Sequence, residues 1–227
     1  MHRTRRLALT PEHLAKIARV VPKEDGVSRF TPLSDADFTA LADRLLADLG
    51  TQPFWLFAYG SLIWKPDFEH EAALRCIAHG WRRSFCLKLT GWRATQAVPG
   101  LMLALKRGGA CTGIAYRMPP DQPQARMLRL LRREIAYHED IDWLRWLTVR
   151  GAGGTFRALA FYCTSEDPDI LNLSLEEQAT WIARAVGPAG SCAEYLHNTV
   201  VHLEALGIRD RYLWALQRRV AEEIDRL

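Results

Sequence analysis

The sequence has no apolar run long enough to span a membrane, and it lacks the common motifs that hold metals or nucleotides. Of its 227 residues, 48% are hydrophobic and 25% are charged. No H-E-x-x-H or H-x-H pattern places two of the seven histidines on one face, and neither G-x-G-x-x-G nor a P-loop occurs. We therefore expect no membrane association, no metal and no cofactor.

Cysteine is scarce and its spacing is uninformative. The five thiols form no C-x-x-C pair, and their number is odd, so neither a disulfide framework nor a zinc site is indicated. The N-terminus is basic, but it has no uninterrupted apolar core followed by a cleavage site, which argues against a secretory signal and leaves a transit peptide as the weaker alternative. We expect a cytoplasmic protein with reduced, mostly buried thiols.

Lysine is also scarce, since only five of the thirty basic residues are lysines. The formal net charge of +4 is a modest surplus. It indicates solubility and attraction for small anions more than a groove for nucleic acid. We therefore expect a small-molecule partner and no nucleic acid.

The first fifty residues are predicted to be a helical extension. Thr10 followed by Pro11 is typical of a helix start, and Ser34 with Asp37 opens a second helix whose apolar residues have helical spacing. The segment 21–32 is predicted to be a loop. The extension could pack on the core or project as an accessory arm, and residues 51–227 form the predicted main domain.

The remainder of the chain alternates between strand and helix patterns. We expect hairpins at Gly108-Gly109 and at 151–154, because glycines supply the positive φ that tight turns need. One helix is predicted over 122–138 and three more end the chain, of which the first opens with the capping box Ser174-x-x-Glu177. The predicted strands are 54–58, 74–89, 101–107, 110–118, 144–150 and 155–163, and the last helices are 174–186, 191–206 and 209–225. Strands in the middle with helices at the edges favour an α+β fold.

Glu134 is the most informative residue of the predicted helix 122–138. At about 100° per residue, its side chain falls within the apolar stripe, between Met127 and Leu130, while Arg133 falls on the opposite face. The positions three and four away hold no arginine that could pair with it. The stripe comprises Met127, Leu128, Leu130, Leu131 and Ile135, and the opposite face carries Arg126, Arg129, Arg132 and Arg133. A surface glutamate paired with arginine is the alternative, but a carboxylate directed at the core is typically paired or functional. Desolvation would raise its pKa and suit it to proton transfer.

Two further features are open to more than one interpretation. Tyr59-Gly60-Ser61-Leu62 follows an apolar run and is either a turn or a loop that holds a ligand. It lacks the glycines of a nucleophile elbow, which argues against Ser61 as a nucleophile. In the predicted helix 191–206, Tyr195 lies at the edge of the apolar stripe and could reach a cavity, whereas Glu194 falls on the opposite, solvated face.

Five strings together resemble the ChaC family of glutathione-specific γ-glutamylcyclotransferases. In order along the chain they are FAYGSLIWKPDF, GWRRSFC, VPGLMLALKRGGACTGIAYRM, LLRREI and GPAGSCAEYL. The similarity runs from about residue 54 to residue 206. It implies a small mixed β-barrel with flanking helices, the γ-glutamylcyclotransferase fold, and the cyclisation of a γ-glutamyl group to 5-oxoproline, which releases cysteinylglycine when the substrate is glutathione.

The resemblance also implies roles for particular residues. Glu134 matches the family's catalytic glutamate, the Tyr59–Leu62 segment matches the loop that holds the γ-glutamyl group, and Tyr195 matches a substrate-contacting tyrosine. The sequence departs from many relatives at Ser191-Cys192, where they have Arg-Asn, which weakens any prediction of strict glutathione preference.

Two alternative functions follow from the same residues. A cyclotransferase could act on other γ-glutamyl amines or peptides, and the family has also carried a cation-transport-regulator label. A desolvated base argues against a purely regulatory protein, which needs none. The sequence does not predict the oligomeric state.

Overall fold

The computed structural model describes residues 7–23, 30–164 and 167–227. Contacts divide the chain into two compact units, each assembled from separate segments. The barrel unit contains Gly26–Arg82 and Leu105–Thr164, and the helical unit contains Met1–Asp25, Arg83–Ala104 and Ser165–Leu227. In the described ranges, no helix is both long and apolar enough to cross a membrane.

The strands form a closed barrel with the order β1-β3-β2-β4-β5. β1, β4 and β5 lie wholly in the barrel unit, whereas β2 and β3 each have one end in the segment 83–104 of the helical unit. Strand β1 is antiparallel to β3 and parallel to β5, so the barrel is mixed. The five strands are β1 (Trp55–Ala58), β2 (Ala72–Leu89), β3 (Gly100–Arg117), β4 (Leu144–Gly151) and β5 (Gly154–Phe161). A closed mixed barrel accompanied by helices confirms the predicted α+β fold.

The barrel interior combines a few large side chains with many small ones. Phe57 and Trp81 are buried among alanines and the thiols of Cys76 and Cys111. Gly113 permits β1 and β3 to approach, because a Cβ there would lie 2.4 Å from the Ala58 carbonyl oxygen. Burial raises the pKa of the Cys76 thiol to about 12, so this thiol is a neutral packing group at physiological pH.

The predicted hairpin at Gly108-Gly109 is wrong. Residues 100–117 form the single long strand β3, although both glycines have positive φ. Both glycines lie against Arg82 of β2, since a Cβ at either position would be 3.6 Å from the Arg82 side chain, which also donates to the Arg107 carbonyl. Gly80 on β2 likewise has positive φ. The glycines therefore bend a continuous strand and do not reverse it.

The second predicted hairpin is confirmed. β4 and β5 pair antiparallel along their whole lengths and close at the pair Gly151–Gly154. Gly154 adopts a φ of 114°, which side chains with a Cβ rarely adopt. This tight connection completes two adjacent walls of the barrel.

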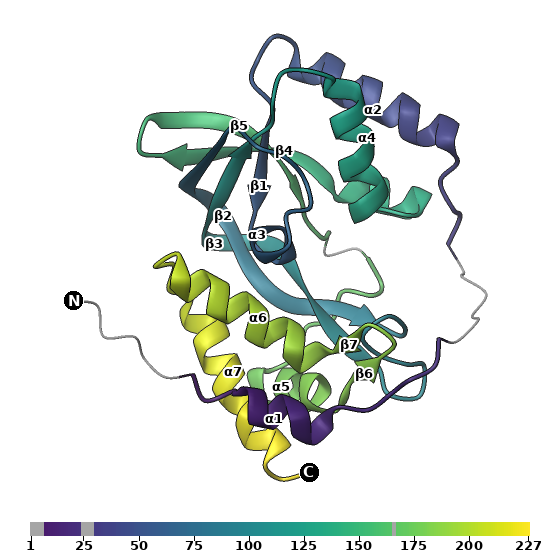
Figure 1. Ribbon diagram of the computed structural model, residues 1–227, viewed down its shortest axis with the longest axis vertical. Helices are drawn as coiled ribbons and strands as arrows, with labels where there is room; N and C mark the ends of the chain where they lie inside the picture. Colours follow the sequence, from purple (N-terminus) through teal and green to yellow (C-terminus); the bar gives the residue numbers. More distant parts are fainter. Residues whose placement is uncertain (1–6, 24–29, 165–166) are drawn as a thin grey trace. The chain divides into compact units, whose positions relative to one another are not determined.

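The helices of the barrel unit are α2 (Asp35–Leu49), the single turn α3 (Ser61–Trp64), α4 (Pro123–Glu134) and the 3₁₀ turn η1 (His138–Trp143). Helix α2 begins as predicted, with a Ser34 and Asp37 capping box, and lies against α4 (Figure 1). Its predicted apolar face is buried and comprises Phe38, Leu41, Leu45 and Leu49. This part of the N-terminal extension therefore packs and does not project.

The helical unit contains α1 (Pro11–Ile17), α5 (Leu175–Arg184), α6 (Cys192–Ala205) and α7 (Arg211–Ile224), with the short pair β6 (Val186–Gly187) and β7 (Gly190–Ser191). The three C-terminal helices lie within the predicted ranges, and the Ser174 and Glu177 capping box opens α5. Helix α7 contacts α1, α5 and α6 (Figure 1).

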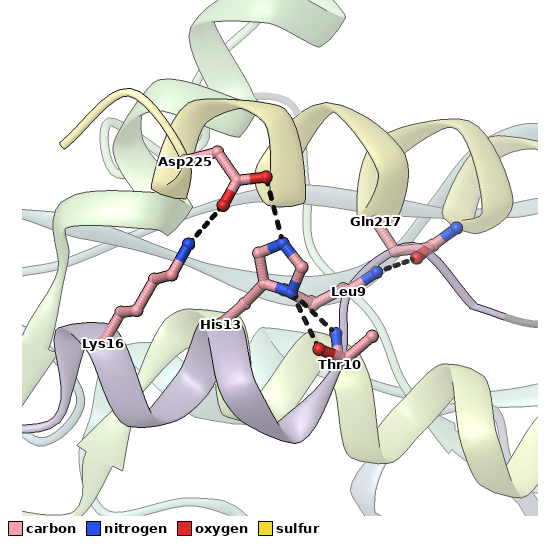
Figure 2. A network of polar contacts seen from close by, with 6 residues as sticks. All are labelled: Leu9, Thr10, His13, Lys16, Gln217 and Asp225. Carbon is pink, nitrogen blue, oxygen red and sulfur yellow. Dashed lines mark hydrogen bonds and ion pairs between the residues drawn. The ribbon is translucent and has the colours of Figure 1, made fainter.

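Polar contacts attach α1 to α7, as Figure 2 shows. The Leu9 amide donates to the Gln217 side chain at 2.7 Å, and both residues are buried. Within α1, His13 of the first turn and Lys16 of the last turn both reach the carboxylate of Asp225. Helix α1 therefore also packs on its neighbours. The predicted boundary at residue 50 stays a prediction.

Candidate active site

The Tyr-Gly-Ser-Leu segment connects the end of β1 to α3. β1 ends at Ala58, and the chain enters α3 at Ser61 with Leu62 buried and Tyr59 packed against the barrel core. The Ile63 amide donates to the Gly60 carbonyl at 2.9 Å. The segment is thus a strand-to-helix connection, and the first amides of such a turn have no acceptor within the helix itself.

Glu134 is the last residue of α4, and its side chain continues the helix's buried face. Met127, Leu130 and Leu131 are buried and lie seven, four and three positions before it. The Glu134 side chain is 19% exposed. The prediction that this carboxylate shares the apolar face is therefore confirmed, although the stripe is centred on these three residues, and Leu128 is only half-buried.

The predicted helix 122–138 extends four residues too far at its C-terminal end. Ile135 already has an extended backbone, and the chain then pairs with residues 31–33. The Leu33 amide donates to the Ala136 carbonyl, and the His138 amide donates to the Thr31 carbonyl. This tertiary pairing ends α4 at Glu134 and fixes the place of the carboxylate.

Arg133 corrects the expectation that no arginine can pair with Glu134. Its Nε lies 3.0 Å from Glu134 Oε1, and its two terminal nitrogens donate to the backbone carbonyls of Lys65 and Pro66. The side chain is 22% exposed, so it does not belong to the solvated face on which the helical wheel places it. It connects Glu134 with the residues that follow Tyr-Gly-Ser-Leu.

Burial raises the pKa of Glu134 above its ordinary value of 4.5, and the Arg133 charge opposes this effect. Desolvation is the larger influence because most of the carboxylate is withdrawn from water. A carboxylate with a raised pKa can both accept and return a proton near neutral pH. In the described ranges, no group of three or more His, Cys, Asp or Glu side chains is placed to hold a metal.

A shallow hollow of about 240 Å³ adjoins this end of α4. It is lined by Asp67, Phe68, Arg129, Leu130, Arg132 and Arg133. Arg129 pairs with Asp67 across it, at 3.5 Å. The hollow therefore borders the residues that follow α3 and the arginine that contacts Glu134.

Tyr195 belongs to the helical unit, and its predicted substrate contact stays a prediction. The residue is buried in α6, where its ring lies 6.1 Å from the Phe85 ring and 5.9 Å from the Arg93 guanidinium carbon. Of the predicted site residues, Glu134 and the Tyr59–Leu62 segment lie in the same unit. Arg133 contacts Glu134 and the carbonyls of Lys65 and Pro66, which directly follow α3.

The sequence predicts that Glu194 is solvated, but the structure shows that it also forms an ion pair. Its carboxylate accepts a hydrogen bond from the nearly buried Arg93 at 2.6 Å, and it is 42% exposed. Arg93 also donates to the Ser191 carbonyl at 2.9 Å. Sequence patterns identify neither Arg93 nor Arg133 as a functional residue, because the tertiary fold brings each arginine to its hydrogen-bond partners. The one local indication is that Arg133 stands next to an inward-facing glutamate in the sequence.

The fold matches that of solved cyclotransferases. A crystal structure of a γ-glutamyl cyclotransferase specific to glutathione from yeast superposes with a TM-score of 0.65 and 22% identity, covering 75% of this chain and 96% of the yeast chain. This likeness shows that the chain has the architecture of the γ-glutamyl cyclotransferases.

The sequence comparisons are more specific. The family model of ChaC-like proteins matches residues 54–223. A glutathione-specific gamma-glutamylcyclotransferase of Escherichia coli is 36% identical over 172 residues, which cover 75% of this chain and 74% of the relative. Glutathione-specific gamma-glutamylcyclotransferase 1 of Homo sapiens is 26% identical over 200 residues, covering 86% and 90%. The chain therefore belongs to the ChaC-like protein family.

Proposed function

We propose that this protein is a γ-glutamylcyclotransferase that converts glutathione to 5-oxoproline and cysteinylglycine. The observation that carries the proposal is the desolvated carboxylate of Glu134, which is connected through Arg133 to the segment that follows Tyr-Gly-Ser-Leu. The names of the relatives support glutathione as the substrate.

In the proposed mechanism, Glu134 acts as general base and then as general acid. The α-amine of the γ-glutamyl group is an ammonium at neutral pH and cannot attack until it loses a proton. Glu134 accepts that proton, the amine nitrogen attacks the γ-carbonyl carbon, and Glu134 returns the proton to the departing amide nitrogen. The attacking nitrogen gives up a second proton as it becomes the ring amide, and the released amine takes up one proton, so the products are a neutral ring amide and an ammonium. The C–N bond of the ring forms as the original peptide C–N bond breaks, so no covalent enzyme intermediate is needed.

Ring closure depends mainly on the conformation of the bound substrate. Nucleophile and carbonyl are already in one molecule, and correct orientation of such groups is worth about 7–11 kcal/mol in favourable cases. The segment from Tyr59 to Leu62 is proposed to hold the γ-glutamyl group, with its backbone amides on either the developing oxyanion or the α-carboxylate. In this assignment Ser61 contacts the substrate and is not a nucleophile, and Tyr195 contributes a further substrate contact.

The preference for glutathione over other γ-glutamyl substrates is a separate and more specific part of the proposal. The two residues that differ from many relatives have structural roles inside the helical unit. Ser191 Oγ accepts a hydrogen bond from the Glu194 amide at 3.0 Å, and Cys192 is buried. Neither side chain is therefore presented as a substitute for the arginine and asparagine of those relatives. Selectivity for the cysteinylglycine part has to come from other contacts, and a substrate comparison tests it.

The experiment is to incubate the purified protein with glutathione, γ-glutamyl-alanine and γ-glutamyl-lysine separately and to quantify 5-oxoproline. We expect the highest kcat/KM with glutathione, together with equimolar cysteinylglycine. Faster turnover of another substrate would assign the protein to the broader class of γ-glutamyl amine cyclotransferases. No 5-oxoproline from any of the three would contradict the proposed enzyme and favour the regulatory alternative. The cytoplasmic location stays a prediction.

A further inference from the structure

Arg133 contacts three acceptors with three different nitrogen atoms. Nε faces the Glu134 carboxylate at 3.0 Å, one terminal nitrogen donates to the Lys65 carbonyl, and the other donates to the Pro66 carbonyl. Lys65 directly follows α3, and its own amide donates to the Ser61 carbonyl at 2.8 Å. A continuous path of polar contacts therefore leads from Ser61 to the carboxylate.

We propose that Arg133 is a positioning residue that holds the Tyr59–Leu62 segment and the Glu134 carboxylate in fixed relative places. The inference rests on the proposed function, because these are the groups proposed to bind the γ-glutamyl group and to move its proton. Arg133 itself is given no contact with the reacting atoms. Its task is to keep the bound amine within reach of the base.

The geometry requires arginine and not merely a positive charge. A guanidinium has five N–H donors in a rigid fork, whereas lysine has one compact ammonium on a flexible stem. Arg133 uses all three nitrogens of that fork, with Nε toward Glu134 and the terminal nitrogens toward the backbone of residues 65 and 66. Lysine can retain the charge beside Glu134, but it cannot hold all three acceptors.

The charge of Arg133 has a separate effect from its shape. It lowers the pKa of Glu134 against the opposing effect of burial. Acidic side chains on the elements next to α4 have partners of their own: Asp35 with Arg132, Asp43 with Gln124, and Asp140 with the amides of Ala136 and Tyr137. Replacing Arg133 by a neutral residue therefore raises the pKa of Glu134 further, whereas replacing it by lysine preserves the charge.

Three variants separate the effect of the shape of the Arg133 side chain from the effect of its charge. We expect Arg133→Lys to lower kcat/KM roughly 10- to 100-fold, since a misplacement of about 1 Å can cost about 100-fold, and to leave the acid limb of the pH profile where it is in the wild type. Arg133→Met should lose as much activity and also shift that limb to higher pH. Arg132→Met is the matched control, because Arg132 lies on the same helix but pairs with the exposed Asp35, and it should stay within about twofold of the wild type.

Hydrogen exchange provides a readout that does not need activity. In the substrate-free protein, Arg133→Met should speed exchange at the amides of Ile63 and Lys65, whose acceptors lie in the same turn, while Arg132→Met should not. Unchanged exchange there, or folded Arg133 variants with wild-type kcat/KM, would overturn the positioning role. An inactive wild type would instead contradict the proposed function, and the exchange experiment would still decide whether Arg133 holds the segment.

Discussion

Two arginine–glutamate pairs, one in each unit, differ in which partner is withdrawn from water. In the barrel unit, the Glu134 carboxylate is 19% exposed and Arg133 is 22% exposed. In the helical unit, Arg93 is only 10% exposed, whereas Glu194 is 42% exposed. The same chemical pair therefore has a desolvated carboxylate at one site and a desolvated guanidinium at the other.

In our proposal, the difference separates the pair that takes part in the reaction from a pair that is structural. Burial of Glu134 raises its pKa above the ordinary value even with an arginine beside it, which is the direction that favours proton transfer by a carboxylate. Arg93 is held between the Ser191 carbonyl and Glu194 and lies near the rings of Trp92 and Tyr195, so it orders the start of α6. An ion pair alone does not indicate catalysis; the exposure of the carboxylate distinguishes the two.

The largest expected effect contrasts the two glutamates. Glu134→Gln removes the proton acceptor and should lower kcat for 5-oxoproline release about 100- to 10,000-fold, the usual contribution of a general base. Glu194→Gln removes a half-exposed carboxylate outside the proposed machinery and should stay within about threefold. Steady-state kinetics with glutathione measures both, with circular dichroism to show that each variant is folded. Equal losses in the two variants would abolish the distinction between the pairs.

The next effect concerns Arg93. Arg93→Met deletes the hydrogen bonds to the Ser191 carbonyl and to Glu194, and hydrogen bonds to charged groups are worth about 1.5–3 kcal/mol each. We expect the free energy of unfolding, from urea denaturation, to fall by about 1.5–3 kcal/mol in total, because the bond to the half-exposed Glu194 is screened by water and adds little to the bond to Ser191. Glu194→Gln should cost less than about 1 kcal/mol, because a half-exposed carboxylate is screened by water. Wild-type stability in Arg93→Met would show that the pair does not order α6.

The smallest effect is a pH dependence of stability. Because the pKa of Glu134 is raised in the folded state, the folded protein binds this proton more tightly than the unfolded chain does, and ionisation of Glu134 destabilises the fold as the pH rises above 4.5. Glu134→Gln removes that cost and leaves the Arg133 contacts to Lys65 and Pro66. We expect a higher melting temperature than the wild type at pH 8 and a difference that vanishes toward pH 4. A difference that grows on acidification would contradict the raised pKa.

Local patterns predict much of this protein. Helical spacing and capping residues place the starts of α1, α2 and α5, and the two-residue link at Gly151–Gly154 predicts the hairpin of β4 and β5. The inward position of Glu134 also follows from spacing alone. These features depend on residues within about seven positions of one another, which is the range that a sequence pattern can report.

The features that the sequence predicts wrongly, or does not predict, depend on residues that are distant in the sequence. Gly108-Gly109 has the same local signature in a hairpin and in a bent strand, and only the neighbouring β2 decides between them. The end of α4 depends on pairing with residues 31–33. The partners of Arg133 include backbone carbonyls about 67 positions away, which no periodicity encodes.

The most direct test of the account is the pH dependence of kcat/KM for glutathione in the wild type and in Glu134→Gln. We predict that the wild type loses activity on acidification with an apparent pKa above 4.5, as Glu134 takes up its proton, and that the residual activity of the variant lacks this acid limb. The ammonium of the substrate titrates identically in both proteins, so it cannot produce the difference. The same acid limb in the variant would contradict the assignment of Glu134 as the base.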